Sequence, residues 1–289
     1  MTESSVKRVN IVKVSQAKSI ITSDLLAIEE PLEIRLEYGL PGNRVVKNIS
    51  VTMRTPGNDE ELAAGFLFTE GLIRESKEIK ELAHCFIACA ENKENVIQVS
   101  LKEGVVPHLQ HTERNFYTTS SCGVCGKGSI DAIRTVSQFA GSLKPDFSMA
   151  SGLLYQLPAS LQQMQAVFAD TGGLHAAALF SLSGELLLLR EDVGRHNALD
   201  KLIGAAMNNQ MLPLNQSLLL LSGRASFELV QKAAMAGISL IAAVGAPSSL
   251  AVELANEFNI TLIGFLRDRR FNIYTAAHRI EIPICELTD

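Results

Sequence analysis

Strand-like and helix-like segments alternate regularly in the second half of the chain, and this alternation restricts the fold more than any other feature. The strand-like segments are near-continuous apolar runs at 217–221, 238–244 and 260–265. Between them, at 226–236 and 248–258, apolar residues recur at helical spacing. Uninterrupted apolar runs are typical of parallel strands that helices bury on both faces. The pattern therefore predicts an α/β unit built on a parallel sheet.

A hairpin and a helix are expected directly before these segments. Apolar runs at 174–182 and 185–189 are joined by Ser-Gly at 183–184, which favours a tight turn. A helix is expected at 197–208, because alanine and leucine recur on one side of it. We therefore predict a three-layer α/β/α domain over residues 129–289.

The first third of the chain is rich in strand-like segments and is predicted to form a smaller α+β domain over 21–118. Its strands are expected at 32–38, 45–53 and 96–101. Pro-Gly-Asn at 41–43 is turn chemistry, so the first two strands are expected to pair antiparallel. Asn58 is a suitable N-cap for a helix, because three acidic residues follow it in the first turn. Residues 1–20 are interpreted as a tail or a first edge strand.

The composition disfavours two classes of partner. The chain has 289 residues and a formal net charge of −5, whereas broad nucleic-acid binding needs a basic surface. Residues 1–10 are polar, and no apolar leader segment follows them. The apolar run at 238–247 is too short to span a membrane. We expect a soluble cytoplasmic protein that binds neither nucleic acid nor membranes.

Two cysteines lie two residues apart in a glycine-rich loop at 119–128. Cys122 and Cys125 are separated by Gly-Val, and a short helix is expected after the loop, at 129–136. Three kinds of chemistry fit this spacing: a redox dithiol, half of a zinc site, and a sulfur-bearing nucleophile. The residues alone leave these alternatives open.

The surroundings of the cysteines bear on these alternatives. Zinc needs four ligands, and Cys85 and Cys89 would supply the other two. They lie in the apolar string Cys-Phe-Ile-Ala-Cys, however, where a free cysteine behaves as a small buried hydrophobic residue. A sulfur carrier needs a reactive thiolate, which Lys127 and the N-terminus of the following helix would favour. The glycines would give the loop the freedom to reach two partners.

Loops of similar chemistry follow the three strands that are expected to be parallel. They lie at 222–226, 245–249 and 266–270. The carboxyl ends of such strands meet at one edge of a sheet, where α/β proteins bind ligands. The first two loops lead into helix N-termini, where free N–H groups favour anions. We therefore predict a pocket for a nucleotide-like ligand that carries phosphate groups.

Basic and hydroxyl side chains in these loops are the expected phosphate ligands. The guanidinium group suits phosphate because its planar fork donates two hydrogen bonds at once. Arg267, Arg269 and Arg270 of the third loop are the main candidates, and Arg224 and Ser248 of the first two loops are weaker ones. Ordinary strand-to-helix turns and a solvated run of charge are the alternative interpretation.

Two segments with histidine flank the expected hairpin. Residues 191–197, Glu-Asp-Val-Gly-Arg-His-Asn, close its second strand and open the next helix. Their charged side chains are interpreted as a buried ion pair or a capping cluster. His175 begins the first strand and is interpreted as a hydrogen-bonded residue of the core or the pocket wall rather than a ligand.

Several short motifs occur together in a fixed order. They lie at 54–57, 61–67, 121–126, 171–177, 191–201, 222–228 and 264–274. Among them are Ser-Cys-Gly-Val-Cys-Gly and Glu-Asp-Val-Gly-Arg-His-Asn-Ala-Leu-Asp-Lys. Taken together, over roughly 30–275, they resemble the formate dehydrogenase accessory sulfurtransferases, the FdhD family.

The resemblance implies a sulfur carrier that serves formate dehydrogenase. Members of this family take sulfur from a cysteine desulfurase as a persulfide and deliver it to the molybdenum cofactor in its bis-molybdopterin guanine dinucleotide form. Cys122 corresponds to the persulfide cysteine, and Cys125 is an auxiliary thiol whose role stays open. The family's cofactor-binding stretch corresponds to Phe265, Leu266, Arg267, Asp268, Arg269 and Arg270, to which we add Arg224 and Ser248.

The resemblance also implies a homodimer and a cytidine deaminase-like fold for the larger domain. Zinc deaminases carry His-x-Glu on one helix and Pro-Cys-x-x-Cys at the start of the next. This chain has His-Asn-Ala at 196–198 and Gly-Arg-Ala-Ser at 223–226 instead, so we expect no metal ligated by protein side chains. A non-catalytic cofactor chaperone with a structural, zinc-binding pair of cysteines is the alternative function.

Overall fold

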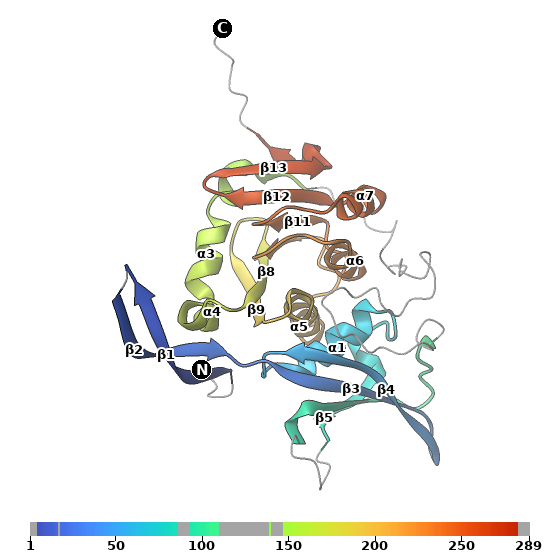
Figure 1. Cartoon of the computed structure of the whole chain (residues 1–289). Helices are drawn as coiled ribbons and strands as arrows, with labels where there is room; N and C mark the ends of the chain where they lie inside the picture. The colour runs from blue at the N-terminus through green and yellow to red at the C-terminus, as the bar shows by residue number, and fades with distance from the viewer. Residues whose placement is uncertain (1–4, 17, 86–92, 110–138, 140–146, 283–289) are drawn as a thin grey trace.

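The computed structural model describes residues 5–16, 18–85, 93–109, 139 and 147–282. It contains a six-stranded and a four-stranded sheet, one above the other in Figure 1, a separate two-stranded hairpin, and a short sheet of β7 (Met149–Ala150) and β14 (Ile280–Glu281). The loop at 119–128 with Cys122 and Cys125, the helix expected at 129–136, and Cys89 all lie outside the described residues.

The larger sheet has six strands in the order β13-β12-β11-β10-β8-β9. Their bounds are β8 His175–Ser181, β9 Leu186–Asp192, β10 Ser217–Leu221, β11 Leu240–Ala243, β12 Thr261–Arg267 and β13 Arg270–Thr275. β10, β11 and β12 are parallel, as expected from their apolar runs. The hairpin β8–β9 and strand β13 are antiparallel to their neighbours, so the sheet is mixed.

Helices cover both faces of this sheet, which confirms the expected three layers (Figure 1). One layer contains α5 (Arg195–Asn208), α6 (Phe227–Met235) and α7 (Ser249–Glu257). The other contains α2 (Ser151–Leu154), α3 (Leu157–Met164) and α4 (Ala166–Thr171). Pro158 lies in the first turn of α3, where its missing N–H is harmless. The likeness to the cytidine deaminase fold stays a prediction.

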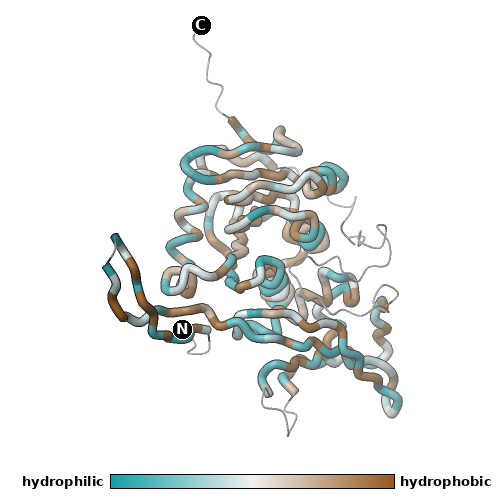
Figure 2. Tube along the Cα trace, viewed as in Figure 1, coloured by the Kyte–Doolittle hydropathy of each residue, from teal (hydrophilic) through white to brown (hydrophobic). Residues whose placement is uncertain are grey.

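The strands supply two separate cores because their side chains point alternately to opposite faces. Leu218 and Leu220 of β10 belong to the core beneath α2 and α3, while Leu219 and Leu221 belong to the core beneath α5 and α6. All four side chains are buried, which explains why residues 218–221 are all apolar. The tube in Figure 2 shows the resulting hydrophobic segments inside this sheet.

The smaller sheet has four strands in the order β4-β3-β6-β5, with α1 (Asp59–Thr69) packed on it. Its strands are β3 Glu30–Leu40, β4 Asn43–Arg54, β5 Ile79–His84 and β6 Val96–Leu101. The antiparallel pairing of β3 with β4 through a turn at 41–42 is confirmed. The α+β character expected for this part of the chain is therefore confirmed too.

Asn58 occupies the N-cap position of α1, as predicted, but it does not cap the helix in the expected way. Its backbone is left-handed, with φ 57°, and its side chain makes no capping hydrogen bond. Asparagine tolerates this conformation better than most residues, which is a different reason for its presence. The three acidic residues of the first turn, Asp59, Glu60 and Glu61, are in place.

Strands β1 (Val6–Ser15) and β2 (Lys18–Ala27) pair only with each other, and we call this hairpin the arm. The prediction of a tail or edge strand over 1–20 has to be corrected, because the boundary at residue 20 falls inside β2. Figure 1 shows the arm extending away from the strand β3 that follows it.

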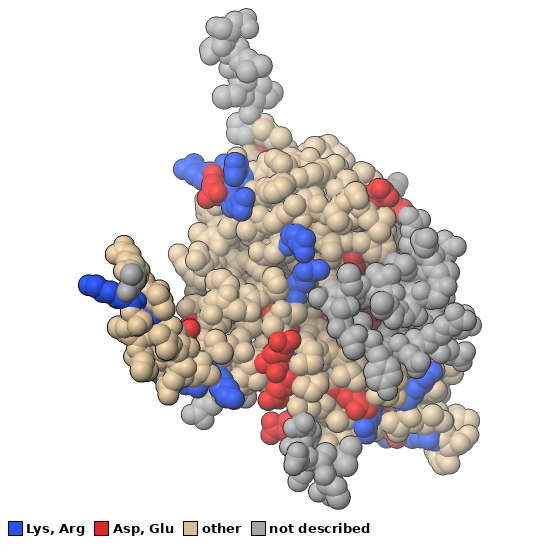
Figure 3. Space-filling model, viewed as in Figure 1, with Lys and Arg blue, Asp and Glu red and all other residues tan. Residues whose placement is uncertain are grey.

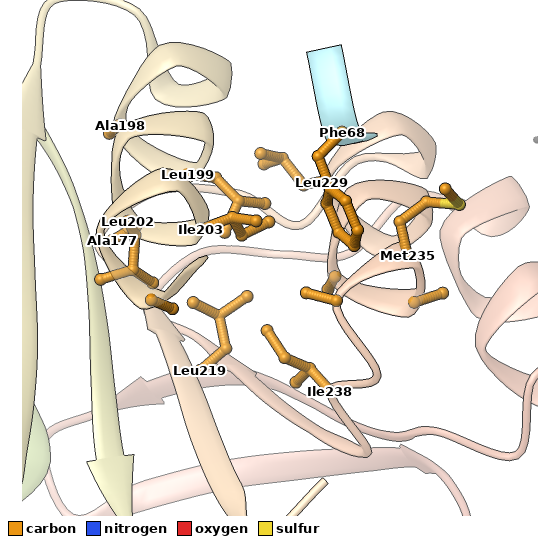
Figure 4. Packing of buried hydrophobic residues seen from close by; sticks show 14 of the residues in the cluster. Phe68, Ala177, Ala198, Leu199, Leu202, Ile203, Leu219, Leu229, Met235 and Ile238 are labelled. Atoms are coloured by element: carbon orange, nitrogen blue, oxygen red, sulfur yellow. The ribbon is translucent and has the colours of Figure 1, made fainter. Parts of the chain in front are cut away.

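The two sheets share one continuous hydrophobic core. Leu32, Ile34 and Leu62 of the smaller unit belong to the same buried cluster as Leu199 and Leu202 of α5. In Figure 4 a stub of α1 carries Phe68 to the side of Leu229 on α6. The expected domains are therefore fused along the α1–α5 contact.

That contact depends on two glycines. A Cβ built on Gly65 would lie 1.9 Å from the carbonyl oxygen of Asp200, and one on Gly204 would lie 1.9 Å from that of Glu61. Only glycine permits the two helix backbones to approach this closely. The crossing fixes the small sheet against the large one.

Candidate functional site

Four chain segments meet at the edge of the large sheet where its parallel strands end. The antiparallel register brings the start of β8 to this edge, because Ala177 lies opposite Leu221, the last residue of β10. His175 in turn lies opposite Asp192, the last residue of β9. The turn from β9 to α5 therefore lies at the same edge as the loops that follow β10 and β11. We call this edge the carboxyl edge.

Backbone hydrogen bonds join the loops after β10 and β11 into one surface. The N–H of Gly245 donates to the carbonyl oxygen of Gly223 at 2.9 Å, and that of Ser248 donates to Ala225 at 3.0 Å. A Cβ on Gly245 would lie 3.0 Å from the carbonyl oxygen of Gly223 and 3.1 Å from the Arg224 nitrogen. The loops thus approach as closely as glycine allows, and two of the predicted phosphate loops do meet.

The two loops lead into the N-termini of α6 and α7. Ser248 caps α7, and its hydroxyl accepts a hydrogen bond from the Ala251 N–H at 3.3 Å. Ser226 holds the same position on α6, but its side chain makes no capping bond there. Arg224 and Ser248 are both exposed on this surface. Free N–H groups beside an exposed guanidinium favour a bound anion.

The third predicted loop has a different structure. Residues 268 and 269 form the turn of a β-hairpin, with φ of 52° at Asp268 and 54° at Arg269. Arg267 and Arg270 face each other across this turn, and all four residues are exposed. The expectation of a third strand-end loop beside the other two therefore has to be corrected. The space-filling view shows basic side chains, with acidic atoms among them, at the upper left (Figure 3).

The other two residues of the predicted cofactor stretch lie before this turn. Phe265 is half-buried, and its N–H donates to the carbonyl oxygen of Gly245 at 3.0 Å, which ties it to the loop after β11. Leu266 is 1% exposed and belongs to the core beneath α2 and α3. The structure thus brings Phe265 to the carboxyl edge and turns the Leu266 side chain away from it.

Two histidines at this edge are held neutral. His196 Nε2 lies 3.4 Å from Ser226 Oγ and 3.4 Å from Glu228 Oε2. Burial, and then the positive charges of Lys232 and Arg195, lower the pKa of His196 to about 3. Burial and Arg195 also lower the pKa of His175, against a smaller opposite effect of Asp192. His175 is half-buried at the start of β8, and its interpretation as a residue of the core or the pocket wall stays a prediction.

A pH titration of folding stability tests the state of His196. Its pKa is lowered in the folded chain, from an ordinary value of 6.5 to about 3, so the unfolded chain alone takes up this proton between those values. The free energy of unfolding should fall as the pH falls through that window, by on the order of 1 kcal/mol per pH unit. In the His196→Gln variant, urea titrations should lose this part of the slope.

His278→Gln is the matched control, because His278 is an exposed histidine. That variant should keep the wild-type slope. Equal slopes for the wild type and His196→Gln would contradict a neutral, buried His196.

The buried ion pair predicted at 191–197 forms at Asp192, but its partner, Lys201, lies beyond that segment. Lys201 Nζ lies 2.7 Å from Asp192 Oδ2 and donates to the Thr55 carbonyl at 2.8 Å. Asp192 also accepts the Gly194 N–H at 2.8 Å. Asn197 donates to the carbonyl oxygen of Met53 at 2.7 Å. This cluster therefore attaches the smaller unit to the turn that begins α5.

A second buried cluster was not predicted. Lys232 Nζ lies 3.0 Å from Asp200 Oδ2, 3.2 Å from Glu70 Oε1 and 3.0 Å from Thr69 Oγ1. Lys232 and Asp200 are almost completely buried. The available signal was a pair of charged residues among apolar ones in each expected helix, Asp200 and Lys201 in 197–208 and Glu228 and Lys232 in 226–236. Their partners could not be identified without the tertiary structure.

Metal-ligating clusters and membrane-spanning helices are both absent from the described part of the chain. There, no group of histidine, cysteine, aspartate and glutamate is arranged to hold a metal ion. Of the proposed zinc ligands only Cys85 falls in that part; it is half-buried, with its Sγ 3.6 Å from Gln98 Oε1. None of the helices described in 5–282 is long and apolar enough to cross a membrane.

Comparison with known proteins gives a consistent result. The FdhD/NarQ family profile matches residues 27–281. A sulfur carrier protein FdhD from Streptomyces avermitilis is 49% identical over 278 residues, covering 96% of each chain. One from Sulfolobus acidocaldarius is 40% identical over 277 residues, covering 96% of this chain and 99% of that one.

One solved structure has the same fold. It is the crystal structure of a candidate formate dehydrogenase accessory protein from Desulfotalea psychrophila, with a TM-score of 0.69 and 23% identity. The match covers 96% of this chain and all of that one. At this level of identity the similarity establishes the fold alone.

Proposed function

The chain belongs to the FdhD/NarQ family, and from that premise we propose that it is a sulfur carrier in the maturation of formate dehydrogenase. The observation that carries the proposal is the near full-length identity of 40–51% to proteins named sulfur carrier protein FdhD. The pair Cys122 and Cys125, in Ser-Cys-Gly-Val-Cys-Gly, supplies the sulfur chemistry that such a role needs.

The first step of the proposed reaction is sulfur uptake at Cys122. The Cys122 thiolate attacks the outer sulfur of a persulfide on a cysteine desulfurase. The sulfur–sulfur bond of the donor breaks, and the donor cysteine leaves as a thiolate. Cys122 then carries the persulfide, and no external oxidant or reductant is consumed.

The second step delivers sulfur to molybdenum of the bis-molybdopterin guanine dinucleotide, which is the substrate. Cys125 attacks the inner sulfur, so the terminal sulfur leaves as hydrosulfide and binds the metal in place of an oxygen ligand, which leaves as hydroxide. Two thiols are oxidised to a disulfide while the transferred sulfur gains two electrons. A cellular dithiol reductant then restores both thiols.

The carboxyl edge is the proposed site for the phosphate-bearing end of this cofactor. The joined loops after β10 and β11 support this assignment, because Arg224 and two helix N-termini lie on one exposed surface. Phe265 borders that surface, and Arg267, Arg269 and Arg270 offer exposed guanidinium groups along the β12–β13 hairpin. Leu266 and Asp268 would contribute to cofactor binding through their backbone groups. The active form is proposed to be a cytoplasmic homodimer.

Mass spectrometry after incubation with a cysteine desulfurase and cysteine tests the carrier role. We expect Cys122 to gain one sulfur atom, and the Cys122→Ala variant to lose both the adduct and all formate dehydrogenase activity in a strain that lacks this protein. Cys85→Ala is the matched control and should behave as the wild type, because Cys85 lies on the small sheet next to Gln98. Full activity with Cys122→Ala would favour the non-catalytic chaperone instead.

A further inference from the structure

The arm exposes large apolar side chains on both of its faces. Residues that lie opposite each other in the antiparallel register share a face, and Val12 lies opposite Ile21. Their side chains are 63% and 85% exposed, and Val14 on the same face is 69% exposed. On the other face Ile20 is 60% exposed. A two-stranded ribbon is marginally stable in water, so such a surface indicates that another element covers it.

The arm is also basic. It contains Lys7, Arg8, Lys13 and Lys18, but only one acidic residue, Asp24. All four basic side chains are exposed. The surface that covers the arm should therefore combine apolar contacts with negative charge.

The same chain has a surface of that kind. A cleft of about 700 Å³ contains five carboxylates, those of Glu30, Asp59, Glu60, Glu61 and Glu94. Figure 3 shows acidic side chains gathered at the lower centre of the view.

Three of these carboxylates are paired within the chain, and one of the three, Glu30, lies 3.5 Å from Arg54. Asp59 is paired with Arg54 at 2.9 Å, and Glu61 accepts a hydrogen bond from Arg190 at 2.6 Å. Glu60 and Glu94 are exposed and project negative charge toward solvent. Ile28 and Pro56 give the cleft an apolar part.

We propose that the arm of one chain packs into the acidic cleft of a second copy, and that the second arm returns the same contact. The arm begins at the rim of its own cleft, because Ile28 follows β2 directly and Ser5 donates to the carbonyl oxygen of Pro56 at 3.1 Å. A two-fold axis beside this root would bring each arm over the other chain's cleft. The inference rests on the homodimer in the proposed function and does not depend on its sulfur chemistry.

Charge reversal gives a direct test by analytical ultracentrifugation of the full chain. The arm variant is Lys13→Glu/Lys18→Glu, and the cleft variant is Glu60→Lys/Glu94→Lys. We expect a wild-type dimer that weakens with salt, and each variant alone should dissociate at least ~10-fold more readily, because like charges then meet at both contacts. A mixture of the two variants should form a heterodimer, since each arm then meets a cleft of opposite charge.

Lys77→Glu/Lys80→Glu is the control, because both residues are exposed and lie outside the arm. It should leave the dimer unchanged. Two results would overturn the arm assignment alone. One is a dimer that the arm variant does not weaken. The other is a failure of the two variants to form a heterodimer when mixed, although circular dichroism shows that both are folded. A monomeric wild type would overturn the dimer as well, whereas the sulfur adduct on Cys122 would stand.

Discussion

Replacing Gly204 by alanine is expected to lower the free energy of unfolding by about 3 kcal/mol, one of the largest effects of a single methyl group in this protein. The new Cβ would lie 1.9 Å from the carbonyl oxygen of Glu61 and 2.7 Å from its carbonyl carbon. These are backbone atoms of α1, so relief requires the helices to separate. Gly65→Ala should have a similar effect through the backbone of Asp200.

The sign of the change in unfolding free energy shows whether packing or helix propensity dominates, because the two have opposite effects when glycine is replaced by alanine. In an exposed helix interior, alanine is more favourable than glycine by about 1 kcal/mol. Gly152, in the short helix α2, is the matched control, because a Cβ there would meet nothing within 4 Å. Urea titrations should show Gly152→Ala at or above wild-type stability and Gly204→Ala well below it. Equal midpoints for the two variants would show that α1 and α5 separate without cost.

Local pattern predicted the large sheet well because its strands are buried on both faces. Leu218 to Leu221 have to be apolar whichever core they face, so the run is continuous and its length gives the strand. The helices between these strands were placed correctly because their apolar residues repeat at helical spacing.

The β12–β13 hairpin was mistaken for a loop because its turn lacks the usual residues. Asp268 and Arg269 adopt a left-handed backbone without glycine or asparagine, which removes the strongest signal for a tight turn. The alternation of Phe271 and Ile273 with polar residues was the remaining signal for β13. The arm was missed in part because both of its faces carry apolar residues, so the alternation of apolar and polar residues that marks a strand is weak there.

Contacts between distant segments could not be predicted at all. Nothing near Gly65 or Gly204 in the sequence identifies the helix that each approaches, since the contact is set by tertiary packing. The structure does not describe Cys122 and Cys125, so it adds nothing to what the sequence says of their chemistry. Their spacing fits several chemistries, and the assignment of Cys122 to sulfur transfer depends on family membership and on the proposed experiment.

The second large effect is expected at the buried cluster around Lys232. Burial alone would lower the pKa of this lysine, but the carboxylates of Asp200 and Glu70 outweigh burial and raise it, so the ammonium group stays charged. Lys232→Met would leave these carboxylates without their cation in the core. Breaking a buried ion pair from one side costs about 3–5 kcal/mol, most of it from the charge that remains.

A surface ion pair of similar geometry provides the control. Lys77 Nζ lies 2.8 Å from Glu75 Oε2, but its side chain is 73% exposed, so Lys77→Met should change stability by less than about 0.5 kcal/mol. The double variant Lys232→Met/Asp200→Asn should recover part of the loss, because it removes one of the stranded charges together with the lysine. If the double variant were less stable than Lys232→Met alone, the buried charge of Asp200 would not be the cause. The cluster joins α6 and α5 to the end of α1, so its loss should also loosen the attachment of the small sheet. Faster hydrogen exchange of the backbone amides of α1 would show this loosening.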